Sequence, residues 1–268
     1  MAMKRSVLVL MILGLWACLM MPAAWAQDPP RNYSLAQGST ISIANVSGDI
    51  SVTGANVPSV IVTTIREGRD KDMVDIEDLS SGGNLSLKTR YPRDGRNYEA
   101  NVRFIVQVPA GSHYKYDSLS TASGDVLLSN VAGEINARTA SGDISMTGIN
   151  GTVRASTASG DIQVRGASGA VTANTASGDI DVELTSIEAS QELQELKFAS
   201  ASGDVTVKVI GPLNAQVEMS TASGSISNDF GLKVDDPEGH GRKASGIVGT
   251  GAVRLKLSAA SGDLRLIK

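Results

Sequence analysis

The chain has 268 residues, of which 41% are hydrophobic, 19% are charged and only 4% are aromatic. This aliphatic content and modest charge exclude an intrinsically disordered chain. The net charge of −4 gives no sign of the clustered Lys and Arg of a nucleic-acid-binding protein, so we expect no nucleic-acid partner. Because rings are scarce, the interior must be built from Val, Ile, Leu, Ala and Thr.

Residues 1–26 have the pattern of a secretory signal peptide. A basic start precedes an apolar run from 7 to 21, and residues 24–26 (AWA) form a small-x-small cleavage site. The apolar run is short for a transmembrane helix, and no later stretch comes close. We therefore predict export to the periplasm, cell envelope or exterior, with cleavage after Ala26 and no transmembrane segment in the mature chain. Lipidation at Cys18, or an uncleaved anchor, is the alternative.

Cleavage after Ala26 would also change what the mature chain can do. It would remove Cys18, the only cysteine, together with both tryptophans. The net charge would become −6, because the two cations at positions 4 and 5 would leave with the signal. Without cysteine, the mature domain could form neither disulfides nor thiolate metal sites, so core packing and backbone hydrogen bonds must hold it.

After a linker at 27–35, residues 36–119 alternate apolar and polar side chains, which is typical of β-strands with one buried face. Three strands are expected within 39–66. A charged segment at 67–82 is predicted to be a loop with one helical turn. Further strands are expected at 84–88, 101–108 and 113–119.

Residues 120–268 contain an internal repeat. The string TASGD followed by Val or Ile recurs with a strict 18-residue period, beginning at Thr121, Thr139, Thr157 and Thr175. Looser copies begin at Ser200, Thr221 and Ala259. The later spacings are wider, which predicts polar loops at 186–197 and 228–246 and a turn at 246–251.

Each repeat unit reads as two short strands joined by Gly-containing turns. Ile144 and Met146 alternate with Ser145 and Thr147, so the period is 2 and not the 3.6 of a helix. Neither strand can bury its apolar side alone, but units stacked about 4.8 Å apart can. Equivalent residues then form inward ladders, of which the clearest contains Val126, Ile144, Ile162 and Ile180. The Thr that opens each unit should turn inward at the corner and hydrogen-bond the neighbouring coil.

The sequence thus predicts an all-β fold, a β-solenoid of the β-helix or β-roll type with two-strand coils of about 18 residues. The strands at 36–119 would pack on the solenoid or cap it. Residues 36–268 are expected to be one continuous domain.

Repeated TASGD units behind a signal peptide, with NVSGDISV upstream and VRFIVQVPAGS leading into the repeats, resemble the putative-adhesin family. Its members are exported bacterial proteins with β-strand repeats, long classified as a domain of unknown function. The resemblance covers about residues 36–268. It implies a β-solenoid of the bacterial envelope, and it brings no family active site to transfer.

The Asp that follows each repeat Gly is the first candidate site. Stacking places Asp125, Asp143, Asp161 and Asp179 in a row about 5 Å apart, where like charges repel. One interpretation is that each carboxylate accepts backbone N–H bonds in its turn and faces water. A cation bridging the row, or an acidic catalytic row, is the alternative. The paired glycines of calcium-binding nonapeptide repeats are missing.

The second candidate is a basic loop with two rings. Exposed aromatic side chains commonly bind sugars, and Tyr91 and Tyr98 lie beside Arg93 and Arg96. A glycan or an anionic envelope polymer would bind here, although a solvated loop explains the same residues.

No catalytic constellation emerges from the outward-facing residues. The two histidines, His113 and His240, are expected to be solvated, and neither a nucleophile elbow nor a phosphate-binding loop is present. We therefore expect an adhesin-like, non-enzymatic structural or binding protein that needs no cofactor. Its partner would be an envelope protein, a glycan or a surface polymer. An envelope polysaccharide lyase or hydrolase is the alternative function.

Overall fold

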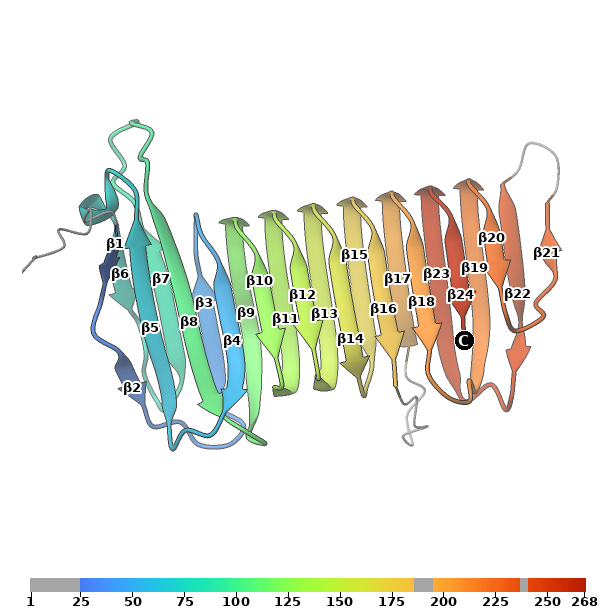
Figure 1. Cartoon of the computed structure of the whole chain (residues 1–268), viewed down its shortest axis with the longest axis horizontal. Coiled ribbons are helices and arrows are strands. Elements are labelled where there is room, and N and C mark those ends of the chain that lie inside the picture. Colours follow the sequence, from blue (N-terminus) through green and yellow to red (C-terminus); the bar gives the residue numbers. More distant parts are fainter. Residues whose placement is uncertain (1–24, 186–194, 237–240) are drawn as a thin grey trace, which may run out of the picture.

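The computed structural model describes residues 25–185, 195–236 and 241–268. The chain forms a flattened rod in which two long β-sheets face one another (Figure 1). Apart from a single turn of 3-10 helix, η1 (Lys71–Met73), the regular elements in the described residues are strands. The all-β solenoid predicted from the repeat is therefore confirmed.

Sheet A contains the strand that follows each repeat Gly-Asp turn. Its hydrogen-bonded order is β1 (Trp25–Gln27), β5 (Val60–Glu67), β8 (Asn101–Pro109), β4 (Ile50–Ala55), β10 (Val126–Ser129), β12 (Ile144–Thr147), β14 (Ile162–Ala167), β16 (Ile180–Leu184), β18 (Val205–Val209), β24 (Leu264–Ile267) and β20 (Ile226–Asn228). A short strand, β2 (Arg31–Tyr33), lies within the predicted linker and also pairs with β5. From β8 to β20 neighbouring strands are parallel.

Sheet B contains the strand that ends in each TAS segment. Its order is β21 (Val234–Asp235), β22 (Arg242–Val248), β19 (Ala215–Ser223), β23 (Val253–Ser261), β17 (Glu195–Ser202), β15 (Val171–Ser177), β13 (Asn150–Ser159), β11 (Ala132–Ser141), β9 (His113–Ser123), β3 (Thr40–Ala44), β7 (Leu85–Arg90) and β6 (Asp75–Asp78). The parallel register matches the 18-residue period, with Val153 beside Val171 and Thr157 beside Thr175.

The core lies between the two sheets and consists of stacked aliphatic side chains. In the predicted ladder, Val126 and Ile144 are fully buried, as is Ile162, and Ile180 is 1% exposed. Most of the predicted loop at 186–197, residues 186–194, lies outside the described residues. Its last three residues already belong to β17, so the loop was predicted too long at that end, whereas Leu196 and Phe198 take the inward positions as predicted.

The corner at each TASGD turn is held by a hydroxyl and a glycine. Thr157 is buried, and its Oγ1 donates to the Gly142 carbonyl oxygen of the adjacent coil at 3.1 Å. The same bond recurs at Thr121, Thr139, Thr175, Ser200 and Thr221. The inward orientation predicted for the repeat Thr is therefore confirmed.

The coils do not stack in chain order at either end of the rod. The last coil in the sequence, β23 and β24, lies between the β17–β18 coil and the β19–β20 coil. Likewise, β3 and β4 lie between the β7–β8 coil and the β9–β10 coil. The β3–β4 coil, near the start of the chain, and the β23–β24 coil, the last in the sequence, are thus interior layers of the rod.

Antiparallel strands cover both ends of the rod. At one end β5 pairs antiparallel with β8, and β6 with β7; at the other, β22 pairs with β19, and β21 with β22. Asn228 folds the chain back past β20, since its amide accepts from the Leu232 N–H and donates to the Leu232 carbonyl. Such covered or very short edges discourage pairing between rods.

These caps correct the loop predictions. Residues 75–78 form β6 rather than part of a charged loop, although the expected helical turn exists as η1. The predicted loop at 228–246 contains β21 and most of β22, and β22 continues into the predicted turn at 246–251. These strands were missed because they pair antiparallel and outside the 18-residue repeat, so no repeated motif marks their positions.

The predicted signal peptide lies almost entirely outside the described residues, which begin at Trp25. Strand β1 pairs Trp25, Ala26 and Gln27 with β5 and so spans the predicted cleavage site. Within the described residues, no helix has the length and apolarity needed to span a membrane.

Candidate functional site

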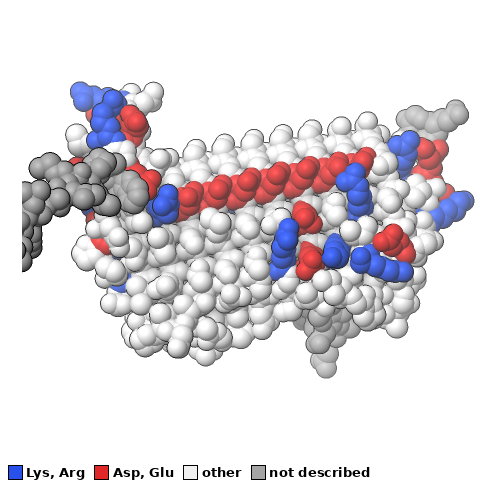
Figure 2. All heavy atoms as spheres, in the orientation of Figure 1, with Lys and Arg blue, Asp and Glu red and all other residues white. Residues whose placement is uncertain are grey.

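The row of repeat carboxylates, which we call the acidic ladder, consists of Asp49, Asp125, Asp143, Asp161, Asp179, Asp204 and Asp263. Figure 2 shows it as an acidic stripe along the rod. In each case one carboxylate oxygen accepts the backbone N–H of the next coil, for example the Asp161 N–H on Asp143 Oδ1 at 2.8 Å. The bond recurs from Asp49 to Asp263 at 2.8–3.0 Å. These residues therefore accept backbone N–H bonds as one interpretation expected, but the donor belongs to the next coil and not to the residue's own turn.

Cations lie near both ends of the acidic ladder, and their positive charge offsets the repulsion between stacked carboxylates. Arg103 Nε lies 3.6 Å from Asp49, and Arg265 contacts both Asp204 and Asp263 at 3.0 Å. The N–H of Ser225, in the terminal coil, donates to Asp263 at 2.8 Å and lowers the pKa of that carboxyl.

Ser225 occupies the one TASG unit that lacks Asp. In the structure its coil is the outermost one, where no further coil offers an N–H to a carboxylate. The deviation at Ser225 was visible in the sequence and is the signal that marks the terminal coil.

No group of three or more His, Cys, Asp or Glu side chains in the described residues is arranged to hold a metal ion. The cation role for Asp125, Asp143, Asp161 and Asp179 stays a prediction, which a chelator titration of thermal stability would test. His113 lies exposed at the start of β9, and His240 lies outside the described residues.

The basic loop holds its predicted residues in two pairs, Tyr91 with Arg93 and Tyr98 with Arg96, and both tyrosine hydroxyls bond to the protein itself. Tyr91 is half-buried, packs on the core and donates to the Ala100 carbonyl at 2.9 Å; burial raises its pKa. Tyr98 donates to Asp94 at 2.6 Å, and Arg96 also lies 3.7 Å from Asp94. Arg93 is exposed beside Tyr91 in a pocket of about 310 Å³. Their binding role stays a prediction.

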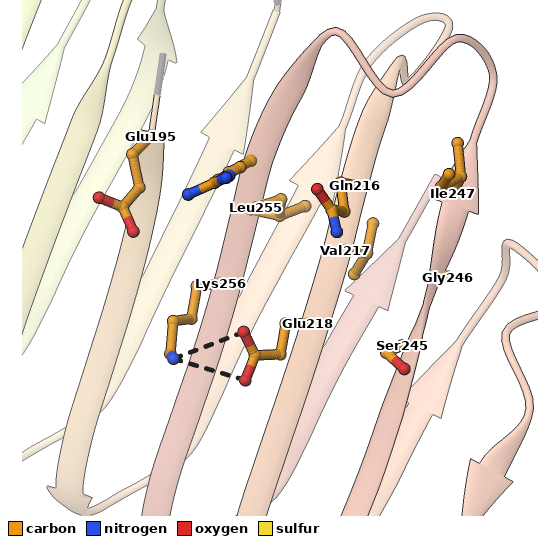
Figure 3. Close-up of a pocket in the computed structure, with 10 residues that line it drawn as sticks. Glu195, Gln216, Val217, Glu218, Ser245, Gly246, Ile247, Leu255 and Lys256 are labelled. Carbon is orange, nitrogen blue, oxygen red and sulfur yellow. Dashed lines mark hydrogen bonds and ion pairs between the residues drawn. The ribbon is translucent and has the colours of Figure 1, made fainter. Parts of the chain in front are cut away.

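A larger groove lies on the outer face of sheet B near the C-terminal cap (Figure 3). It has a volume of about 470 Å³ and crosses four adjacent strands, β17, β23, β19 and β22. Its side chains face outward because their inward neighbours fill the core. Those that decide its chemistry are Glu195, Arg254, Lys256, Gln216, Glu218 and Ile247.

The groove combines charge of both signs with an exposed apolar side chain. Lys256 Nζ lies 3.4 Å from Glu218 Oε1, and Ile247 is 70% exposed. Among the described residues, the Arg254 guanidinium has no ion-pair or hydrogen-bond partner. The groove can therefore offer cationic donors and carboxylate acceptors to a polar ligand.

Sequence reasoning missed this groove because its strands are far apart in the chain. Its lining comes from four separate segments, near residues 195, 216, 246 and 255. They meet because β23 lies between β17 and β19, and because β22 pairs with the other edge of β19. The alternation of buried and outward residues in 242–248 was the available signal.

A family model described as Toastrack DUF4097 matches residues 30–266. The chain belongs to this family. The match spans both sheets and both caps, so the groove and the acidic ladder lie on the family's own fold. The putative-adhesin resemblance is thereby confirmed.

Several solved structures are similar to this chain. One is a "putative cell adhesion protein" from Clostridium sporogenes, 10% identical over 91% of this chain and 99% of that one, with a TM-score of 0.41. Two come from Parabacteroides distasonis. A "putative adhesin" is 10% identical over 90% and 97% (TM-score 0.36), and a "putative lipid binding protein" is 14% identical over 89% and 96% (TM-score 0.38). No curated protein matches the sequence.

Proposed function

We propose that this Toastrack protein is an exported, non-enzymatic element of the bacterial envelope that binds a surface polymer, glycan or protein through the outer face of sheet B. The groove on sheet B is the observation that carries this proposal. It is built on paired strands rather than on loops, so its side chains are held before the partner arrives, which lowers the entropic cost of binding.

Export is supported by the signal pattern at 1–26. Cell fractionation with mass measurement of the mature protein tests it. A measured mass that matches a chain beginning at Gln27 supports cleavage after Ala26. A mass that matches a lipidated chain beginning at Cys18 supports the lipoprotein alternative.

Binding is tested by incubating the mature protein with cell-wall and polysaccharide preparations and scoring retention and product release separately. We expect retention without release, and reduced retention for Arg254→Gln in the groove. The matched control is Arg165→Gln, which removes the same charge from the outer face of sheet A. Turnover that disappears in Glu195→Gln or Glu218→Gln would establish the alternative, a polysaccharide-active enzyme.

The basic loop provides a second surface for the same assay. Arg93 and Arg96 lie between the two loop tyrosines in the sequence, and we propose that they add contacts to an anionic or glycan partner. The variant Arg93→Gln should then reduce retention, while retention unchanged in both Arg93→Gln and Arg96→Gln would remove the loop from the binding surface.

A further inference from the structure

The outer face of sheet B differs in charge from the rest of the molecule. From β9 to β22, the outward cations are Lys115, Arg138, Arg154, Lys197, Lys243, Arg254 and Lys256, and the outward carboxylates are Asp117, Glu134, Glu195 and Glu218. This face is therefore net positive, although the whole chain carries a net charge of −4. A field of this kind attracts anions to one side of the rod.

Three of these cations fall on one line, which we call the cationic row: Arg154, Lys197 and Lys256. The strand register places Arg154 beside Thr172, Thr172 beside Lys197, and Lys197 beside Lys256. The row thus crosses four successive strands about 4.8 Å apart and leads into the groove.

The cationic row is unfavourable for the protein alone. Lys197 and Lys256 are directly opposed like charges on neighbouring strands, an arrangement that destabilises a sheet. Glu218 compensates only Lys256, at 3.4 Å. Among the described residues, Arg154, Lys197 and Arg254 have no carboxylate within ion-pair distance. An anionic partner would supply the missing charge.

The geometry points to a linear polysaccharide carrying carboxylate groups, lying along the rod across β13, β15, β17 and β23 and ending over Arg254 in the groove. This inference rests on the proposed binding function and names its ligand class. The coil spacing is similar to the length of one sugar unit in an extended chain, so successive sugars meet successive coils. Their carboxylates would meet the cationic row, and their hydroxyls would meet side chains such as Thr172.

Two other anionic classes fit this face less well. Between β9 and β22 the described outward side chains include no Phe, Tyr or Trp, so His113, at the start of β9, is the one ring there on which a nucleic acid could stack a base. Ile247 is the only large outward hydrophobic side chain described there. Little apolar surface is therefore available on this face to insert into a lipid bilayer.

The test measures binding of the mature protein to soluble polygalacturonate and to the same polymer with its carboxylates methyl-esterified. We expect binding to the acid form that weakens as NaCl rises past 0.1 M, where the Debye length is about 10 Å. Lys197→Gln and Arg254→Gln should each weaken it by about fivefold, and the Arg165→Gln control by less than about twofold.

Thermal unfolding without polymer separates binding from folding. Lys197→Gln should leave the midpoint unchanged or raise it, because it removes a like-charge contact from the cationic row. A lower midpoint would overturn the inference, since Lys197 would then stabilise the rod by itself.

Three binding outcomes would also overturn it. The esterified polymer could bind as tightly as the acid form, or Arg165→Gln could weaken binding as much as Lys197→Gln and Arg254→Gln do. Alternatively, single-stranded DNA or anionic vesicles could bind more tightly than polygalacturonate. Retention on envelope preparations without binding to polygalacturonate would contradict the ligand class and leave the proposed function standing. If the protein bound neither envelope preparations nor polygalacturonate, the proposed function and the ligand class would both be contradicted.

Discussion

The repeat glycines set how closely the coils stack, and Gly160→Ala tests this directly. Gly160 has a φ of +143°, and a Cβ added there would lie 2.0 Å from the carbonyl oxygen and 2.6 Å from the carbonyl carbon of Gly142. Both atoms belong to the backbone of the neighbouring coil, so they cannot rotate away as a side chain would. The alanine can be accommodated only if the two coils separate at this corner.

The cost follows from what that separation breaks. Opening the corner by about 1 Å loses three hydrogen bonds: from the Gly142 N–H to the Ser159 carbonyl (3.0 Å), from Thr157 Oγ1 to the Gly142 carbonyl (3.1 Å) and from the Asp161 N–H to Asp143 Oδ1 (2.8 Å). At about 1 kcal/mol each, with a further 1–3 kcal/mol for the strained φ, Gly160→Ala should lower the free energy of unfolding by about 4–6 kcal/mol.

Gly166→Ala is the matched control. Gly166 also has a positive φ, +66°, but its added Cβ would have no neighbour closer than 3.7 Å, which is an ordinary contact. Only the left-handed backbone opposes it, at a cost of about 1–2 kcal/mol. Urea denaturation followed by circular dichroism compares the two, and equal losses of stability would refute the argument that coil contact dictates glycine at the corner.

The other predictions concern the core and the end of the acidic ladder. Tyr116→Phe should leave the free energy of unfolding unchanged or raise it by about 1 kcal/mol, because the buried Tyr116 hydroxyl has no hydrogen-bond partner among the described residues; a loss in urea denaturation would reveal a hidden partner. Ile162→Asp should abolish cooperative unfolding by placing a charge in the core, whereas Gln163→Asp, on the outer face, should cost little; equal effects would contradict the burial pattern. The Ser225 N–H holds the pKa of Asp263 below its ordinary 3.8, so this bond stabilises the terminal coil above that pH and is lost as the pH falls through the lower folded value. The hydrogen-exchange protection factors of β20, which are corrected for the intrinsic exchange rate at each pH, should therefore fall at acid pH in the wild type but change less in Asp263→Asn.

The repeat region could be predicted almost residue by residue, for a physical reason. A parallel stack with a fixed period repeats one environment, so a residue such as Ile162 or Thr157 reports its position through its equivalents in the other units. The alternation then separates the buried side chains from the outward ones. The acidic ladder followed from the same reasoning, since a carboxylate after each Gly meets the same N–H in every coil.

The caps and the groove could not be predicted in this way. Strands β6, β21 and β22 pair antiparallel with their neighbours, and no repeat fixes their register. The groove depends on β23 lying between β17 and β19, and the repeat motif gives no spatial order when the loops between units are long. Of the clues available, only Ser225 distinguishes the outermost coil from the others.

The position of β23 and β24 has a consequence for how the rod is made. This layer follows both of its neighbours in the chain, yet it lies between them and shares their ASG motif. If the β19–β20 coil stacked directly on β17–β18, the Ser225 N–H would meet Asp204 instead of Asp263. We therefore expect folding to include a step in which β23 and β24 insert between these two coils, rather than adding to the tip of the rod.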